Sequence, residues 1–333
     1  MKKGLKSKVT SSPKSYSIGI DLGASQIKYG IVSAKGKVLI PGNLPTPVRP
    51  GRKAVISSLQ QIAEQLFNFA KKNKIQIKAI GIGSPGCINL KTGVVLGSCP
   101  NLPFWQGVNL KKIFQKYSLP VFADNDANLV ALAESKFGIA KNYNNVVCLT
   151  IGSGIGGGII LNGEVYRGSN YAAGEIGHTS VNFLGEKCNC GTLGCLEAYA
   201  SVNSILKRSQ RLVRFNKNSF LNQLIRENGN QLSLDILFQA LRKKDKIAQK
   251  IIEQTCDILS SGIANLVNIL NPEIVVIGGG LVEVDSNIIR RIERIVKLKA
   301  FPTATKYLKI KRASLGNQAG FIGAGYWAIE ESN

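Results

Sequence analysis

Histidine and acidic residues are scarce in this chain, and long apolar runs are absent. One histidine occurs among 333 residues, and 20 acidic residues stand against 43 lysines and arginines, a formal net charge of +23. No apolar run approaches the ~20 residues of a membrane-spanning helix. The basic segment 1–15 also lacks the apolar core of a signal peptide. We therefore predict a cytoplasmic protein without membrane contact, with a flexible basic tail over residues 1–15.

The excess positive charge is spread along the chain. Lysine-rich segments at 71–74, 242–246 and 306–312 lie far apart, and none alternates with aromatic residues as in single-strand binders. We predict no nucleic-acid partner. Two explanations of the charge stay open: a generally basic composition, and faster capture of an anionic substrate.

The only histidine lies close to three of the seven cysteines. His178, Cys188, Cys190 and Cys195 follow the spacing H-x9-C-x-C-x4-C. Imidazole and thiolate suit a closed tetrahedral zinc site, and four protein ligands leave no position for a catalytic water. The spacing therefore predicts structural zinc, and the odd cysteine count favours a reducing compartment. The other cysteines are interpreted as small buried side chains: Cys87, Cys99, Cys148 and Cys256.

Two strand–glycine turn–strand units, DLGASQIKYGI and TIGSGIGGGII, lie about 130 residues apart. They predict a duplicated α/β module with a ligand in the cleft between the copies. We expect a small domain over 16–133 with 316–333, and a large domain over 134–315 that contains the zinc knuckle 178–195. Strands are predicted within 16–21, 28–34, 37–40, 78–86, 118–126, 145–161, 272–280 and 306–314, and helices over 54–72, 126–138, from about 196, 233–243, 246–270, 286–298 and 317–331.

The first glycine turn has the composition of a phosphate-binding loop. Gly23 lets backbone N–H groups approach an anion, and Ser25 adds a hydroxyl donor. Asp21, at the end of the strand, is a candidate ligand for Mg²⁺. Lys28 either reaches the phosphate or is a surface lysine of the next strand.

The second turn is richer in glycine, with five glycines in the seven residues 152–158. A hairpin alone does not need so many. Neither turn has the P-loop pattern G-x-x-x-x-G-K-[ST], and the dinucleotide fingerprint also fails because strands, not helices, follow both turns. A third glycine run also ends a strand, where α/β sheets bind ligands. The predicted phosphate-binding residues of these two runs are Gly152, Ser153, Gly154, Gly156, Gly157, Gly278, Gly279 and Gly280.

Acidic residues mark the rest of the candidate site. The segment DNDAN at 124–128 lies at a strand-to-helix junction, where Asp126 is either a helix cap or a general base. Glu175 and Glu197 flank the zinc knuckle, so a bound ion would fix both carboxylates in space.

These motifs together resemble the ROK family of bacterial sugar kinases, repressors and open reading frames. DLGASQIK, SPG, DNDANLVALAE, GSGIGGG, AGEIGH, CNCGTLGCLEAYAS, VVIGGG and GNQAGFIGA occur in the family's order over roughly residues 16–325. The resemblance implies an actin-like ATPase, ribonuclease-H-like α/β fold with two domains around a central cleft. It also implies a homodimer or homotetramer.

The resemblance assigns roles residue by residue. Asp126 matches the catalytic base that accepts a proton from the sugar's 6-hydroxyl. The glycine loops and Asp21 match the sites for ATP and Mg²⁺. The sugar would be bound by Gly86, Asn125, Asp126, Glu175, His178 and Glu197. The chain departs from the family at Ala24, which replaces a glycine, at Ser25, which replaces a threonine, and at Asp124, where glutamate is common.

The family contains both enzymes and repressors. Some fifteen residues precede the first predicted strand, too few for the winged-helix domain of the repressors, so we expect an enzyme. The expected reaction is that of a hexokinase-class sugar kinase, with glucokinase activity favoured by analogy. Fructose, mannose, N-acetylglucosamine and N-acetylmannosamine stay open as substrates, polyphosphate as donor, and a non-catalytic sugar sensor as a further alternative.

Overall fold

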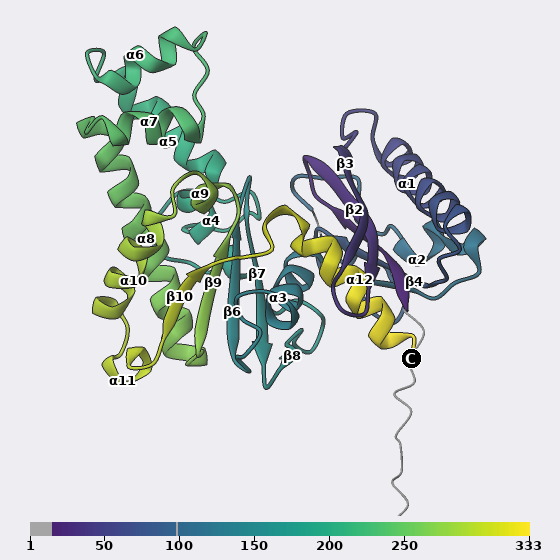
Figure 1. The fold of residues 1–333 in the computed structure, drawn as a ribbon. Helices are drawn as coiled ribbons and strands as arrows, with labels where there is room; N and C mark the ends of the chain where they lie inside the picture. The colour runs from purple at the N-terminus through teal and green to yellow at the C-terminus, as the bar shows by residue number, and fades with distance from the viewer. Residues whose placement is uncertain (1–14, 98) are drawn as a thin grey trace, which may run out of the picture.

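The computed structural model describes residues 15–97 and 99–333. Its strands form two five-stranded mixed sheets, in the orders β3-β2-β1-β4-β5 and β10-β9-β6-β7-β8. Figure 1 shows the first sheet on the right and the second near the middle, with a tall helical lobe beyond the second. Apart from Ser15, the predicted flexible tail lies outside the described residues.

The two sheets repeat one topology. In each, three strands form an antiparallel meander and two further strands join in parallel. The duplicated core and the actin-like, ribonuclease-H-like fold are therefore as predicted. The first sheet contains β1 (Tyr16–Leu22), β2 (Gln26–Ser33), β3 (Val38–Pro45), β4 (Ile77–Ser84) and β5 (Val121–Asn125). The second contains β6 (Val146–Ile151), β7 (Ile155–Leu161), β8 (Glu164–Val165), β9 (Ile274–Gly278) and β10 (Lys309–Arg312).

Helix α1 (Arg52–Lys72) covers one face of the first sheet. Its buried residues include Val55, Leu59, Ile62 and Leu66, whose spacing forms one apolar stripe. These residues pack in one core cluster with Ile18 and other strand residues. The short helix α2 (Leu110–Ile113) was not predicted; its N-cap is Asn109, which accepts a hydrogen bond from the Lys112 N–H.

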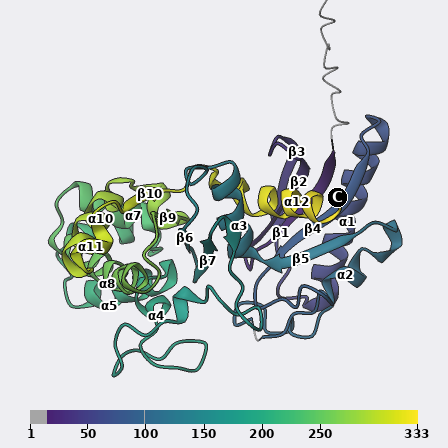
Figure 2. The same ribbon diagram turned by 90° about the horizontal axis from the view of Figure 1, so that it is seen from below.

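Two helices pack against each other between the sheets. Helix α12 (Ala319–Glu331) lies on β1 and β4, and α3 (Asp126–Lys136) lies on β7 and β6. The backbones approach closely because glycines face the helices. A Cβ atom at Gly19 or Gly81 would overlap the main-chain oxygens of Phe321 and Ala324, and one at Gly323 would overlap that of Leu129. Helices α12 and α3 thus lie between the two sheets and connect them (Figure 2).

The other face of the second sheet carries most of the helices. The N-caps Ser201, Ser219, Ser233 and Asp245 each accept backbone N–H bonds at the start of the helix that follows. The helices predicted at 233–243, 246–270 and 286–298 are confirmed, whereas α6, α9 and α11 were not predicted. The helices of this lobe are α4 (Leu196–Ala200), α5 (Val202–Arg214), α6 (Phe220–Glu227), α7 (Leu234–Arg242), α8 (Lys246–Leu270), α9 (Gly280–Val284), α10 (Asn287–Lys299) and α11 (Pro302–Thr305).

Within residues 15–97 and 99–333, the helices are too short or too polar to cross a membrane. The residue boundaries of the two domains stay a prediction.

Candidate active site

A cleft of about 480 Å³ is lined by residues that follow strands of both sheets. Asp21 lies at the end of β1, Gly86 follows β4, and Asp126 follows β5. From the second sheet, Gly152 follows β6 and Gly278 ends β9. The ends of neighbouring strands meet at one edge of a sheet, which explains why distant segments converge here.

Most residues predicted for the site line this one cleft. Gly157 and the three cysteines of the knuckle do not. The lining residues among the predicted set are Asp21, Gly23, Ser25, Lys28, Gly86, Asn125, Asp126, Gly152, Ser153, Gly154, Gly156, Glu175, His178, Glu197, Gly278, Gly279 and Gly280. Their individual roles stay predictions.

Asp126 is the first residue of α3 and is not its cap. Asn125 caps the helix, because its Oδ1 accepts hydrogen bonds from the Ala127 N–H at 2.9 Å and the Asn128 N–H at 3.2 Å. The Asn125 side chain also donates to the Gly86 main-chain oxygen at 3.2 Å. With the helix end satisfied by Asn125, the Asp126 carboxylate is available to the cleft.

The environment of Asp126 favours its protonated form. Burial is the main cause that raises the pKa of this carboxyl to about 7, and the nearby carboxylates of Asp21 and Glu175 act in the same direction. A hydrogen bond from the Ala127 N–H, at 2.9 Å, works in the opposite direction. A carboxyl whose pKa lies near neutrality can accept a proton from a hydroxyl group and later release it.

The first glycine turn is tight. The Gly23 N–H donates to the Gln26 main-chain oxygen at 2.9 Å. Ala24 is not among the described residues with positive φ, so its Cβ introduces no backbone strain. Burial raises the pKa of Asp21 to about 6, against the opposing charge of Lys28 on the paired strand position. Lys28 lines the cleft. Its ammonium group donates to the side-chain oxygen of Asn317, shortly before α12, at 3.1 Å.

The glycines at 152–158 serve two purposes. Gly152 to Gly154 form the turn between β6 and β7, closed by the Gly152 N–H bond to the Gly154 oxygen at 2.9 Å. Gly156, Gly157 and Gly158 belong to β7. A Cβ at Gly158 would lie 2.7 Å from the Ala127 oxygen. One at Gly157 would contact the Gly174 oxygen, so these strand glycines permit close packing next to the site.

The third glycine run ends β9 and begins α9. Gly279 has a φ of 93°, a conformation that glycine adopts without strain. A Cβ there would also meet the Ile151 main chain. This run and the second glycine turn therefore lie side by side along one side of the cleft.

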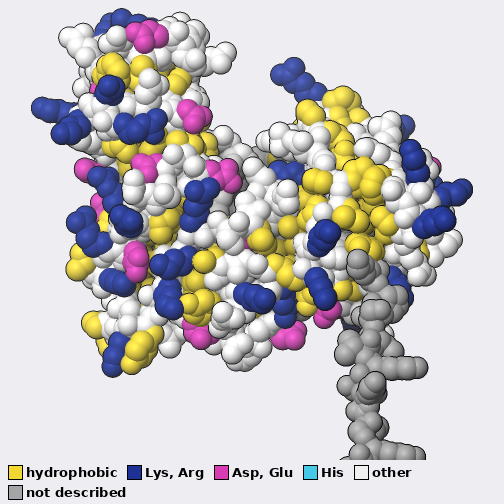
Figure 3. All heavy atoms as spheres, in the orientation of Figure 1, with side chains coloured by type: hydrophobic (Ala, Val, Ile, Leu, Met, Phe, Trp, Pro, Cys, Tyr) yellow, Lys and Arg dark blue, Asp and Glu magenta, His cyan; other side chains and the backbone are white. Residues whose placement is uncertain are grey.

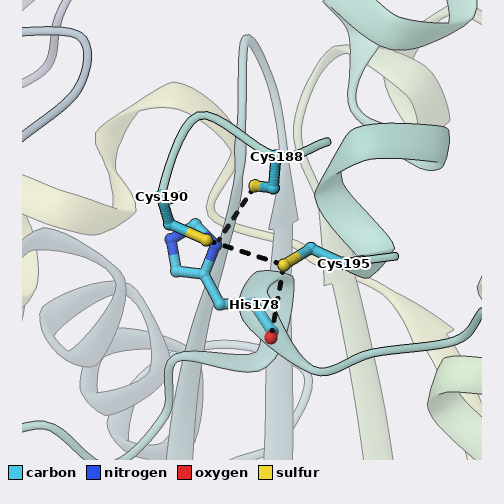
Figure 4. A group of neighbouring side chains, drawn as sticks. All are labelled: His178, Cys188, Cys190 and Cys195. Carbon is cyan, nitrogen blue, oxygen red and sulfur yellow. Dashed lines mark hydrogen bonds between the residues drawn. The ribbon is translucent and has the colours of Figure 1, made fainter. Parts of the chain in front are cut away.

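The histidine and the three cysteines converge as predicted from their spacing (Figure 4). One ligand atom from each lies within 4.8 Å of the others. Cys190 Sγ lies 3.6 Å from Cys195 Sγ, and Cys188 Sγ lies 3.7 Å from His178 Nδ1. Ligands at zinc-like bond lengths in a tetrahedron are separated by about 3.5–3.8 Å. The donor atoms and their spacing therefore fit a tetrahedral metal ion.

The two nitrogens of His178 face different neighbours. Nδ1 points to the cysteine cluster, whereas Nε2 lies 3.9 Å from Glu175 Oε2. Glu197 is held from another direction, since its Oε2 accepts the Ile155 N–H at 2.8 Å. One imidazole can thus bind a metal through Nδ1 and present Nε2 to the cleft.

Sequence reasoning missed several residues that line the cleft. Cys99 was interpreted only as a small buried side chain. It also lines the cleft, and its thiol donates to the Pro85 main-chain oxygen at 3.3 Å. Cys87, outside the lining, lies 3.6 Å from Glu175 Oε1. The only available signal was that Cys87 directly follows the SPG turn, and no feature of the sequence indicated Cys99. Other lining residues without a prediction include the polar residues Asn101, Thr150, Glu283, Arg312 and Asn317.

Comparison with known proteins agrees with this architecture. The chain is 33% identical to a glucokinase of Halalkalibacterium halodurans over 318 residues, covering 95% of this chain and 96% of that protein. It is also 33% identical to the xylose repressor of Caldicellulosiruptor bescii, covering 92% of this chain and 76% of the repressor. The crystal structure of a ROK family glucokinase from Streptomyces griseus, in complex with glucose and AMPPNP, superposes with a TM-score of 0.83 at 27% identity, covering 95% and 99% of the two chains. Residues 17–331 match the ROK family, and the chain belongs to that family.

Proposed function

We propose that this protein is an ATP-dependent sugar kinase that phosphorylates the 6-hydroxyl of a hexose. The observation that carries the proposal is the place of Asp126. Its carboxyl is freed from helix capping, lies in a cleft between two glycine turns and has a pKa raised to about 7. Kinases need a proton acceptor beside the attacking hydroxyl and backbone donors around the phosphates, and this cleft offers both.

The proposed step is an in-line phosphoryl transfer. The sugar's 6-hydroxyl oxygen forms a bond to the γ-phosphorus while the bond to the β–γ bridging oxygen breaks, and ADP leaves. The hydroxyl proton passes to the Asp126 carboxylate. The Gly23 and Gly152 N–H groups close their own turns, so the other backbone N–H groups of these two turns would orient the phosphates, and closing the cleft would exclude water.

The donor set of the cleft also fits the expected cofactors. Burial raises the pKa of Asp21 to about 6, and the positive charge of Lys28 lowers this pKa only in part. Such a carboxylate suits a divalent cation. Bound Mg²⁺ would neutralise charge on the phosphates of ATP. At the knuckle, the three cysteines and His178 Nδ1 would hold structural zinc, which would fix the orientation of Nε2 toward the sugar.

Glucose is the favoured substrate, supported by the glucokinase relatives. Other hexoses and N-acetylhexosamines share the primary hydroxyl and remain alternatives, as does polyphosphate as donor. A homodimer or homotetramer and a cytoplasmic location remain expectations from the sequence.

A sugar-sensing protein without catalysis is the second candidate, favoured by the similarity to xylose repressors. The deciding experiment is a coupled ADP-release assay with five sugars, ATP and Mg²⁺, alongside calorimetric sugar binding and wells with polyphosphate. Turnover on glucose with ATP supports the kinase. Sugar binding without turnover on either donor would contradict it and favour the sensor.

A further inference from the structure

A buried ion pair lies beside the cleft and has no part in the mechanism above. Nε and Nη2 of Arg167 both lie 2.8 Å from Asp124 Oδ2. The two side chains are 18% and 3% exposed. The second oxygen, Asp124 Oδ1, accepts from the Asn125 N–H at 2.7 Å and from the Asn128 side chain at 3.2 Å. Both carboxylate oxygens are therefore satisfied, as a buried charge requires.

The Asp124 end of the pair fixes the turn that carries Asp126. Asp124 belongs to β5, and its Oδ1 bonds span the junction between the strand and the first turn of α3. Asn125 and Asn128, the two residues that it binds, lie on either side of Asp126 in the sequence. The direction of the Asp126 side chain thus depends on where the Asp124 carboxylate is held.

The Arg167 end belongs to the other sheet. Arg167 lies just after β8, and its main-chain oxygen accepts the Ala173 N–H at 3.1 Å. The loop closed by this bond leads directly to Glu175 and His178. The guanidinium also lies 5.2 Å from the ring centre of Trp327 in α12. The Arg167 side chain therefore contacts β5, α12 and the Val165 main-chain oxygen at 3.3 Å, while its main chain closes the loop that leads to the predicted sugar-binding residues.

We propose that Arg167 is a positioning residue for phosphoryl transfer. It holds the turn bearing Asp126 at a fixed distance from the loop bearing Glu175, so that the base meets the 6-hydroxyl of the sugar that this loop helps to bind. The inference rests on the proposed kinase function. Arg167 itself lies outside the cleft lining, so we expect it to act through Asp124 and not by contact with substrate.

Two variants separate this role from simple stabilisation of the fold. Arg167→Met leaves the Asp124 charge buried without its partner, so we expect a lower Tm and a kcat reduced at least about ten-fold. In Arg167→Met with Asp124→Asn the stranded charge is gone, while the side-chain oxygen of the introduced asparagine can still accept from Asn125 and Asn128. We expect that double variant to regain a Tm near that of the wild type while kcat stays at least about ten-fold low, because the link across the sheets is missing.

Arg167→Lys is a conservative variant that keeps the charge and loses the paired contact to Oδ2; we expect an intermediate kcat. Lys116→Met is the matched control, because its exposed pair with Glu64, at 2.8 Å, lies outside the cleft lining. It should leave kcat and the sugar KM unchanged. All variants are compared for kcat, sugar KM, calorimetric sugar affinity and Tm.

A double variant that regains kcat together with its Tm would overturn the inference, since Arg167 would then only neutralise a buried charge. A single Arg167→Met variant with unchanged kcat would overturn it as well. Wild-type protein without turnover on any sugar is a different result: it would overturn the proposed kinase function, and this inference with it.

Discussion

At the scale of single residues, the proposed function of Asp126 requires its ionised form, whereas the stability of the fold favours its protonated form. Burial raises its pKa from 3.8 to about 7, so the folded protein binds this proton more tightly than the unfolded chain. The stabilisation is fully present below about pH 4 and is lost as the pH rises through about 7, where the buried carboxyl must ionise. Asp126 must be ionised to act as a base, and this ionisation lowers the free energy of unfolding.

Asp126→Asn tests both effects in one variant. We expect kcat to fall by about 10²–10⁴-fold because no proton acceptor remains, with sugar binding retained. We also expect a Tm above that of the wild type at pH 8 and a smaller difference at pH 5. Kinetics, calorimetry and thermal melts at the two pH values measure these outcomes. Substantial retained turnover would exclude Asp126 as the base.

The pH dependence of the rate gives a second residue-scale prediction. The base acts in its ionised form, so kcat/KM should fall as the pH drops through about 7. The carboxylates of Asp21 and Glu175 help to raise the pKa of Asp126. Glu175→Gln removes one of these charges and should move the midpoint of the profile downward. An acid limb that stays flat to about pH 5.5 would contradict the assigned pKa.

At the scale of elements, the segment 178–195 is a loop whose order should depend on a bound ion if its four clustered ligands hold zinc. Cys190→Ser should remove the metal, lower the Tm and raise the sugar KM, because His178 and the adjoining acids lose their fixed orientation. Metal content by mass spectrometry, thermal melts and sugar kinetics check this. Cys256→Ser is the control, a buried thiol of α8 that is not one of the four clustered ligands. Full metal loss with unchanged Tm and KM would contradict a structural ion.

The sequence predicted most elements, and its failures have physical causes. Strands β1 and β2 were found from the apolar runs that flank Gly23, and α1 from the helical spacing of its apolar residues. Helix α9 was missed because it begins within the run Gly278 to Gly280, which was interpreted as a phosphate-binding run at the end of a strand. The surplus glycines of β7 were assigned to a phosphate turn, whereas Gly158 serves packing against α3.

The candidate site shows the same division. The sequence spacing alone predicted that His178 and the three cysteines lie together, because all four residues come from one local segment. The pairing of Arg167 with Asp124 joins residues 43 positions apart on different sheets. No local pattern indicates such a contact, since it depends on how the two halves pack. Arg312 and Asn317 line the cleft but were not predicted, for the same reason.

At the scale of the whole molecule, the charge of the surface and the charge of the cleft oppose each other. Figure 3 shows lysine and arginine side chains scattered over one face and not gathered in one patch. The cleft lining, in contrast, contains the five acids Asp21, Asp126, Glu175, Glu197 and Glu283 and two basic residues, Lys28 and Arg312. An anionic donor would be attracted by the molecule and repelled locally, so Mg²⁺ would be needed at the final approach.

This opposition predicts a salt dependence that is specific to the donor. The net charge of +23 acts over distances comparable to the Debye length, which falls from about 30 Å at 0.01 M salt to about 8 Å at 0.15 M. We expect kcat/KM for ATP to fall roughly three- to ten-fold over this range, mainly through KM, because the long-range attraction is screened. The sugar KM, measured at saturating ATP, is the internal control, since a neutral sugar is not attracted. If kcat/KM for ATP does not change with salt, the positive charge has no part in capturing the donor and reflects composition alone.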